Sequence, residues 1–468
     1  MNRIMLALYR IALACVCCAA LGRAMAAVPA GVSQVMAAQR LPAGASSIVI
    51  VEADSGHVVM SHNADTPRSP ASTIKTVTTF AALDMLGPAF LWQTRAWLYD
   101  GDLILQGGGD PYMTLERWWS FVQGLRADGL KSIRGDIVID NTAFSLGRED
   151  PGAFDGRPNR SYNVSPDALM VNFQSIDFKL FADPDSHKVQ VIANPAPVNL
   201  DVENRIRFAP GRCGGSAGRV DFQVASATWD RVVFSGALSP HCAERNFARV
   251  LLQPATYAFG TFVALWRQSG GEFSGKLRIE PTPADAKPLL TFDSLSLGEI
   301  VRLTNKHSSN LMARHLLLTL GKERYGDPAT PEKGAAAIAD WGRERGFDLT
   351  GVDIDNGSGL SRTTHISALQ MAKVLNAAYH SRFAPEFLAS LPLAGMDGTL
   401  RARMKGSPAG SVRLKTGHLE SVSGVAGYVT TAAGKTYILV SLVNHVRADF
   451  GAAEPLHAAL VAWILDNL

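Results

Sequence analysis

The chain has 468 residues, with 45 lysine and arginine side chains against 42 aspartate and glutamate side chains. This length predicts about three domain-sized units, and the near balance of charge, without a long basic run, argues against nucleic-acid binding. Residues 1–26 begin with basic residues, continue with an apolar run at residues 11–21 and end with the small-residue site Ala24-Met25-Ala26. This pattern is typical of a secretory signal peptide. An uncleaved N-terminal anchor is the alternative, although the apolar run is short for a bilayer span.

Removal of this segment changes both the charge and the cysteine content of the chain. The segment holds three arginines and no acid, so 42 basic residues remain against 42 acidic residues. Of the five cysteines only Cys213 and Cys242 remain, and an oxidising compartment predicts that they form a disulfide. The alternative is a pair of free buried thiols. Two cysteines without a matching pair of histidines predict no zinc site.

The first elements after the signal are a hairpin and a helix. Residues 46–52 and 57–61 are β-rich runs joined by a glycine-containing turn. A proline-rich break at residues 67–71 follows, and apolar residues then recur at helical spacing over residues 72–86, which predicts a helix that ends at Gly87-Pro88.

The middle of the chain differs from the preceding segment in its composition and in its predicted secondary structure. Short strand-like runs with frequent glycine, proline and asparagine predict a β-rich inserted region over residues 98–289, made of two small domains with the cysteine pair in the second. Within it we expect helices at residues 115–125 and 257–268. Helical and strand patterns then return. We expect helices at residues 297–306, 310–321, 331–346 and 454–468, and strands at residues 412–416, 422–430 and 435–443.

The apolar terminal helix has two interpretations. It can lie on a membrane surface, or it can pack on the sheet. The second is favoured because the helix lacks a basic face, so we expect at most peripheral membrane association.

Ser72 and Lys75 form the first candidate site. Among the 13 lysines of the chain, only Lys75 has a serine three positions earlier. At this spacing the hydroxyl and the amine lie on one face of a helix, and the helix N-terminus offers free N–H groups to an oxyanion. Lys75 can act as a base only if desolvation or a neighbouring cation lowers its pKa. The alternative is a helix N-cap with an exposed lysine.

The Ser-x-Asn pattern occurs three times, so it is not informative by itself. The occurrence at Ser61-His62-Asn63 precedes Ser72 and lies in strand-like sequence, and the one at Ser161-Tyr162-Asn163 is the real rival. We favour Ser308-Ser309-Asn310, because apolar residues follow it at helical spacing and place the polar side chains at a helix entrance.

Lys415-Thr416-Gly417 is the only Lys-[Ser/Thr]-Gly in the chain and ends a strand-like run. Alternation along an edge strand points Lys415 and Gly417 to the same side, and glycine permits the close approach of a substrate backbone. A cation beside a hydroxyl suits a substrate carboxylate. The alternative is a turn with a solvated lysine.

In this order the three motifs resemble the signature of penicillin-binding proteins and serine β-lactamases. Further segments resemble the D-alanyl-D-alanine carboxypeptidases of the peptidase S13 family. They are Asp355-Asn356-Gly357-Ser358-Gly359-Leu360-Ser361, the run at residues 394–400, and the runs at residues 105–114 and 135–140. The separation of 343 residues from Ser72 to Lys415 also fits that family. One departure is His418, which stands where the family commonly has serine or threonine.

The resemblance implies an α+β fold of the penicillin-recognising type, a serine transpeptidase/β-lactamase-like antiparallel sheet flanked by helices. The catalytic domain comprises residues 27–97 and 290–468, and the β-rich insertion separates them. The implied activity is a serine D-Ala-D-Ala carboxypeptidase, with an endopeptidase activity as a further option, acting on peptidoglycan stem peptides in the periplasm and inhibited covalently by β-lactams. No metal or other cofactor is expected.

The resemblance also assigns roles to the motif residues. Ser72 is the nucleophile, Lys75 the base and Ser308 a proton relay. Asn310 is a hydrogen-bond partner of Lys75 and of the substrate amide. Further residues bind the substrate: Lys415 and Thr416 its carboxylate, Gly417 its backbone, and the N–H of His418 the oxyanion. A catalytic role for the His418 imidazole is less favoured than an exposed or packed side chain. Two alternatives stay open: a β-lactamase, and a non-catalytic cell-wall binding or scaffold protein on the same fold.

Overall fold

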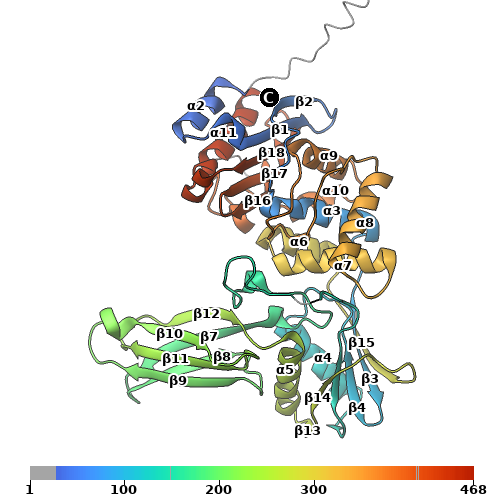
Figure 1. The fold of residues 1–468 in the computed structure, drawn as a ribbon, viewed down its shortest axis with the longest axis vertical. Coiled ribbons are helices and arrows are strands. Elements are labelled where there is room, and N and C mark those ends of the chain that lie inside the picture. Colours follow the sequence, from blue (N-terminus) through green and yellow to red (C-terminus); the bar gives the residue numbers. More distant parts are fainter. Residues whose placement is uncertain (1–27, 148, 407, 409) are drawn as a thin grey trace, which may run out of the picture.

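The computed structural model of the chain describes residues 28–147, 149–406, 408 and 410–468 (Figure 1). The predicted signal peptide and its three cysteines lie outside these residues. In this described part of the chain, no helix combines the length and the apolar character that a membrane span needs.

A five-stranded antiparallel sheet forms the centre of the upper part of the molecule in Figure 1. Its strand order is β16-β17-β18-β1-β2, so the strand with the Lys-Thr-Gly motif lies at one edge, as predicted. Most residues of the inner strands are buried on both faces, which requires a helical layer on each side. The strands are β1 Ser46–Glu52, β2 Val58–His62, β16 Val412–Leu419, β17 Val422–Thr430 and β18 Thr436–Asn444.

Helices cover both faces of this sheet, which confirms the predicted α+β sandwich. One face packs against α2 (Ala30–Ala38) and α11 (Ala453–Asn467) through an apolar cluster that includes Met36 and Leu460. Thus the terminal helix packs on the sheet. The other face is covered by six helices: α3 Lys75–Leu86, α6 Leu297–His307, α7 Asn310–Tyr325, α8 Pro331–Glu344, α9 Ala368–Tyr379 and α10 Ala384–Ser390.

The prediction of one helix over residues 72–86 was wrong at its start. Ala71–Ile74 form a 3₁₀ turn, and α3 begins only at Lys75. The reason is local, because the N–H of Thr73 bonds to the carbonyl of Pro70 and the Thr73 hydroxyl donates to the same oxygen at 2.7 Å. The helices α2, α9 and α10 were not predicted.

A second five-stranded sheet, of mixed pairing, begins the inserted region. Its order is β14-β6-β4-β3-β15, and β3 pairs with β15 although about 190 residues separate them. The predicted domain boundaries fall inside these two strands, and the division into domains stays a prediction. The strands are β3 Gln93–Tyr99, β4 Asp102–Gln106, β6 Ile137–Asp140, β14 Leu277–Ile279 and β15 Lys287–Asp293.

Two three-stranded sheets, β10-β11-β9 and β12-β7-β8, extend the insertion on the left of Figure 1, and β13 and β5 form a short pair. One apolar cluster joins these sheets to two helices. A disulfide links Cys213 and Cys242 here, as predicted. The elements are α4 Leu115–Ala127, α5 Pro254–Gln268, β5 Ser132–Ile133, β7 Ser175–Asp183, β8 Lys188–Asn194, β9 Asp201–Phe208, β10 Val220–Val224, β11 Arg231–Leu238, β12 Arg245–Val250 and β13 Glu272–Phe273.

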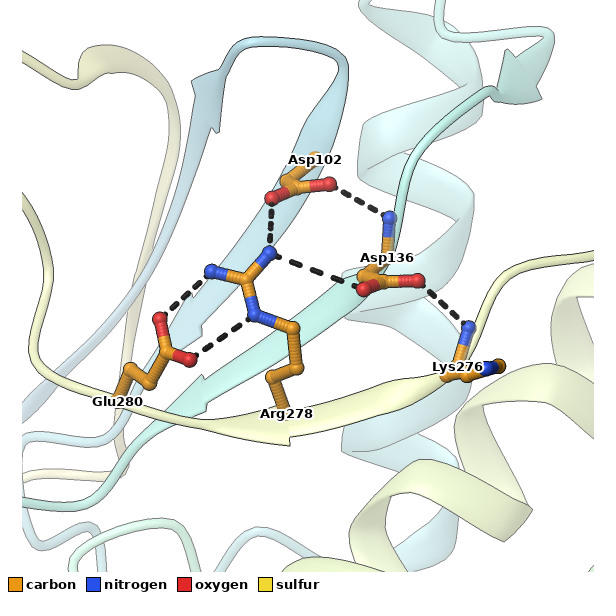
Figure 2. Close-up of polar contacts among 5 residues, drawn as sticks. All are labelled: Asp102, Asp136, Lys276, Arg278 and Glu280. Atoms are coloured by element: carbon orange, nitrogen blue, oxygen red, sulfur yellow. Dashed lines mark hydrogen bonds and ion pairs between the residues drawn. The ribbon is translucent and has the colours of Figure 1, made fainter.

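A charged cluster closes the edge of the mixed sheet at β14 (Figure 2). The Arg278 guanidinium donates to Asp102 at 2.7 Å and to Glu280 at 2.6 and 3.0 Å, and lies 3.7 Å from Asp136. The second oxygens of the two aspartates accept backbone N–H groups of Asp136 and Lys276, at 2.6 and 2.8 Å. This network holds the short edge strand on its neighbours and presents charge where another strand could add.

Candidate active site

Ser72 lies in the 3₁₀ turn that leads into α3, and this turn contacts the edge strand β16. The preceding residue, Ala71, has a φ of +46°, which is uncommon for a residue with a side chain. Gly359 packs against this turn so closely that a Cβ there would lie 1.9 Å from the Ala71 carbonyl oxygen. The segment around Gly359 therefore fixes the conformation that presents Ser72.

Lys75 is fully buried behind Ser72. Its Nζ donates to Ser72 Oγ at 2.9 Å, to Asn310 Oδ1 at 2.7 Å and to the Ser358 carbonyl at 2.5 Å. None of the ion pairs found among the described residues involves Lys75. Burial, and then the charge of Lys415, hold the pKa of Lys75 well below its ordinary value, which favours the neutral amine that a base requires.

Ser308 and Asn310 are placed by the junction of α6 and α7. The chain leaves α6 with Ser308 in the left-handed region, at a φ of +56°, and the Ser309 hydroxyl caps α7 by accepting the Met312 N–H at 3.3 Å. Ser308 and Asn310 consequently point back toward the site. Ser308 Oγ accepts from Lys415 Nζ at 2.8 Å, and Asn310 contacts Lys75 as described.

Lys415 and Gly417 lie on the inner side of β16, as the alternation predicted. Lys415 is fully buried, and its Nζ donates to Ser308 Oγ and, at 2.7 Å, to the Thr416 carbonyl. Burial lowers the pKa of Lys415 to about 7. A Cβ on Gly417 would lie 2.6 Å from the Pro70 carbonyl oxygen and 3.0 Å from the Ser72 nitrogen, so glycine permits β16 to approach the serine turn.

Thr416 and His418 lie on the other side of the strand. The Thr416 hydroxyl donates to the Thr399 hydroxyl at 2.8 Å, and the side chain of His418 is exposed. The structure thus brings together Ser72, Lys75, Ser308, Asn310, Lys415 and Gly417.

Three contributors to the site received no role in the sequence analysis, although all three lie in segments that it singled out. The Ser358 carbonyl accepts from Lys75, and Thr399 meets Thr416. The third is Tyr162, in the middle of the rival Ser161-Tyr162-Asn163 motif, whose carbonyl accepts from Asn310 Nδ2 at 3.1 Å. Thus the rival motif lies beside the site, but it is Ser308 that contacts Lys415.

A cavity of about 480 Å³ borders this site. It reaches from Ser308 and Asn310 to residues of the inserted region, where aromatic side chains and small residues form its walls. These include Tyr112, Tyr162, Phe173, Ser175 and Ala248. No cluster of three or more His, Cys, Asp or Glu side chains that could hold a metal occurs within the described residues.

Comparison with known proteins gives consistent matches. The model of the D-Ala-D-Ala carboxypeptidase 3 (S13) family matches residues 28–465. The D-alanyl-D-alanine carboxypeptidase of Actinomadura sp. (strain R39) is 28% identical over 435 residues, covering 86% of this chain and 78% of that protein. The D-alanyl-D-alanine carboxypeptidase DacB of Haemophilus influenzae is 25% identical over 437 residues, covering 91% of each. The crystal structure of penicillin binding protein 4 (dacB) from Haemophilus influenzae has a TM-score of 0.77 at 25% identity, covering 92% of this chain and 99% of that chain.

Proposed function

Because the chain belongs to the D-Ala-D-Ala carboxypeptidase 3 (S13) family, we propose that it removes the terminal D-Ala from peptidoglycan stem peptides through an acyl-enzyme on Ser72. One observation carries this proposal. Lys75 is buried, is found in no ion pair with a described residue, and has its Nζ 2.9 Å from Ser72 Oγ. As a neutral amine it can donate its two N–H groups to Asn310 Oδ1 and the Ser358 carbonyl and accept the Ser72 proton with its lone pair. A buried amine with neutral oxygen partners favours its uncharged form, and only that form can take the serine proton.

The first step forms the acyl-enzyme. Lys75 takes the proton of Ser72 as the Ser72 oxygen attacks the carbonyl carbon of the penultimate D-Ala. The backbone N–H groups of Ser72 and His418 bind the oxyanion, and each such donor typically stabilises the transition state by about 3 kcal/mol. The C–N bond then breaks, and Ser308 passes its proton to the departing D-Ala amine. The proton that Lys75 took from Ser72 replaces it on Ser308, so Lys75 is neutral again before the second step. Lys415 and Thr416 bind the terminal carboxylate.

The second step releases the shortened peptide. Water attacks the ester, the same lysine serves as general base, and Ser72 regains its proton. The contact of Ser308 with Lys415, at 2.8 Å, supports the relay because Ser308 accepts this hydrogen bond and keeps its own proton for the leaving amine.

The proposal is tested by incubating the purified protein with penicillin, followed by mass spectrometry of the intact chain and of its peptides. We expect a stable adduct on Ser72 and none with Ser72→Ala. No adduct on folded wild-type protein would contradict the proposal. Rapid turnover of the adduct would favour a β-lactamase, and binding of peptidoglycan that persists in Ser72→Ala, with no D-Ala release by the wild type, would favour a scaffold protein.

The same proposal gives the compartment and the partners. We propose that the protein acts in the periplasm, on stem peptides, and that β-lactams inhibit it covalently. The signal-peptide pattern of residues 1–26 and the disulfide between Cys213 and Cys242 both support an exported protein.

Cleavage of cross-links between stem peptides is a second candidate activity. The cavity of about 480 Å³ that borders Ser308 supports this second activity. In the proposed reaction the amine of the leaving group lies at Ser308, and when that group is D-Ala its methyl side chain fills only a small part of the cavity. A diamino-acid side chain of a second stem peptide is long enough to enter it. The exposed Ala248 lines the cavity, so Ala248→Trp should reduce its volume.

The cavity's role is tested with two substrates. We expect Ala248→Trp to lower kcat/KM for a cross-linked muropeptide dimer about tenfold, and to change D-Ala release from a monomeric pentapeptide by less than twofold. The matched control is Ala284→Trp, which changes an exposed alanine of the inserted region outside this cavity. Equal effects on both substrates would argue against a leaving-group subsite.

A further inference from the structure

The inserted region contains a cavity that the proposed reaction does not use. Its volume is about 620 Å³, within the range of about 300–1,000 Å³ that is usual for ligand sites. The aromatic side chains of Phe144 and Trp229 line it together with the amide side chains of Asn141, Gln174 and Gln253. Aromatic walls with a few placed polar groups are the ordinary lining of a ligand site. We call this space the Trp229 cavity.

The backbone beside the Trp229 cavity is held in an uncommon conformation at three residues. Gln174, Trp229 and Leu252 have φ angles of +54°, +57° and +64°, a region that large side chains rarely adopt. They are joined by hydrogen bonds, because the Leu252 N–H donates to the Trp229 carbonyl at 3.0 Å and the Leu252 carbonyl accepts from Gln174 Nε2. Strain of this kind gathers at functional sites, where the surrounding structure maintains it. Here it presents Gln174 and Trp229 to the cavity.

The polar groups of the Trp229 cavity suit a ligand that is rich in hydroxyl and N–H donors. Asn141 Nδ2 donates to Asp167 at 2.8 Å, and Gln174 Nε2 donates to the Leu252 carbonyl. Each of these bonds orients an amide by its nitrogen and leaves the amide oxygen as an acceptor. Carboxylates in the wall, such as that of Asp150, accept as well and oppose the binding of an anion.

A smaller cavity connects the Trp229 cavity with the serine turn. It has a volume of about 360 Å³ and shares lining residues with the Trp229 cavity, among them Ser165. Leu360 lines it as well, and packs in an apolar cluster with Ala71, the residue before Ser72. The two cavities therefore adjoin, and the pair extends from the serine turn into the inserted region.

From these features we infer that the Trp229 cavity binds the glycan strand that carries the stem peptide, an inference that rests on the proposed function. The ligand class is a neutral N-acetylated amino sugar. Its ring packs on the face of Trp229, which is partly exposed, and its hydroxyl and acetamido N–H groups donate to the amide oxygens of Asn141 and Gln174.

The length of the stem peptide agrees with this placement. The peptide is attached by its N-terminus to the lactyl group of N-acetylmuramic acid, and four residues lie between that group and the bond that Ser72 attacks. Four residues span at most about 14 Å when fully extended. The glycan therefore stays beside the active site while the peptide is bound, and a cavity next to the one that adjoins the serine turn is a suitable place for it.

The kinetic test compares two substrates with the same pentapeptide, one free and one attached to the disaccharide N-acetylglucosaminyl-N-acetylmuramic acid. A ring contact and a hydrogen bond together contribute about tenfold, so we expect the wild type to have a kcat/KM about tenfold higher for the disaccharide-pentapeptide. Trp229→Ala should abolish this difference, and Trp229→Phe, which keeps an aromatic face, should retain most of it. The matched control is Trp119→Ala, which changes a tryptophan of the inserted region that is 49% exposed and outside the cavity, and should retain the full difference.

A binding measurement needs no change in the cavity. We expect titration calorimetry of the Ser72→Ala protein with the free disaccharide to show saturable binding. Absence of binding would overturn the glycan site even if Trp229→Ala does not fold. Equal kcat/KM for the two substrates in the wild type, or a difference that Trp229→Ala leaves unchanged, would also overturn it.

These outcomes are distinct from failure of the proposed function. Release of D-Ala from the free pentapeptide with no effect of the disaccharide leaves the carboxypeptidase in place and removes only the glycan site. If neither substrate loses D-Ala and penicillin forms no adduct, the proposed function fails, and the calorimetric titration still decides whether the Trp229 cavity binds the disaccharide.

Discussion

Asn310→Asp tests the central claim that Lys75 works as a neutral amine. Asn310 Oδ1 accepts from Lys75 Nζ at 2.7 Å, and the substitution replaces the amide by a carboxylate of the same shape. An anion at this place stabilises the protonated form of Lys75 and raises its pKa, which opposes the burial and the Lys415 charge that now lower it. We therefore expect acylation to need a higher pH.

The magnitude follows from the contact distance. For unit charges 2.7 Å apart, Coulomb's law gives about 1.5 kcal/mol in water and about 6 kcal/mol at an effective dielectric constant of about 20, which raises the pKa of Lys75 by about one to four pH units. On the acid side of its pKa, each unit reduces the neutral fraction of the amine tenfold. Acylation near neutral pH should fall about tenfold or more.

The assay is the second-order rate of penicillin acylation across pH. Asn310→Asp should shift the acid limb of the profile toward higher pH by at least one unit and recover part of the rate in alkaline buffer. Asn310→Ala is the matched control, because it removes the same hydrogen bond without adding charge and should lower the rate without that shift. An equal loss at every pH in both variants would refute the neutral-lysine mechanism.

Three further predictions concern other parts of the molecule. Burial lowers the pKa of Lys415 to about 7, so the charged form of Lys415 dominates only below that pH. We therefore expect kcat/KM for a carboxylate peptide to decline above about pH 7, as measured by initial rates across pH. Lys415→Arg keeps its charge at these pH values and should remove the decline. Gly417→Ala places a Cβ 2.6 Å from the Pro70 carbonyl and should abolish penicillin acylation, whereas Gly44→Ala, with open space around its Cβ, should not. Replacing Cys213 and Cys242 by alanine opens a loop of 29 residues and should lower the free energy of unfolding by about 3.5 kcal/mol in the chain-entropy model; an unchanged urea midpoint would contradict this.

The predictable parts of the site are those whose placement depends on local periodicity. Lys75 follows Ser72 by three residues, and both a 3₁₀ turn and an α-helix bring such residues to one face. The predicted contact between Ser72 and Lys75 is therefore present, with 2.9 Å between Ser72 Oγ and Lys75 Nζ, although the helix begins later than predicted. Lys415 and Gly417 share a side of β16 because side chains alternate along a strand.

The missed helices show a different limit. Helix α9 carries a signal that was available, since Ser367 and Gln370 form a capping box at its start and apolar residues follow at helical spacing. Helix α10 has only seven residues, and so short a segment depends on tertiary packing more than on its own sequence. Helix α2 has nine residues and buries only Val32 and Met36, which is too few apolar positions to show a helical period in the sequence.

The residues that complete the site were unpredictable for a chemical reason. Lys75 donates to the Ser358 carbonyl and Lys415 to the Thr416 carbonyl, and Asn310 donates to the carbonyl of Tyr162. All three carbonyls belong to segments that the sequence analysis singled out. Every residue has a backbone carbonyl, however, so no side-chain pattern predicts which of these carbonyls a lysine or an amide contacts. The same contacts explain how two buried lysines can work together. Backbone and hydroxyl oxygens satisfy their N–H donors without supplying the negative charge that would fix both as cations, so burial can lower the pKa of each. A carboxylate that contacts either lysine would be easier to find in the sequence. It would also stabilise the protonated form of that lysine, and a protonated Lys75 cannot accept the Ser72 proton.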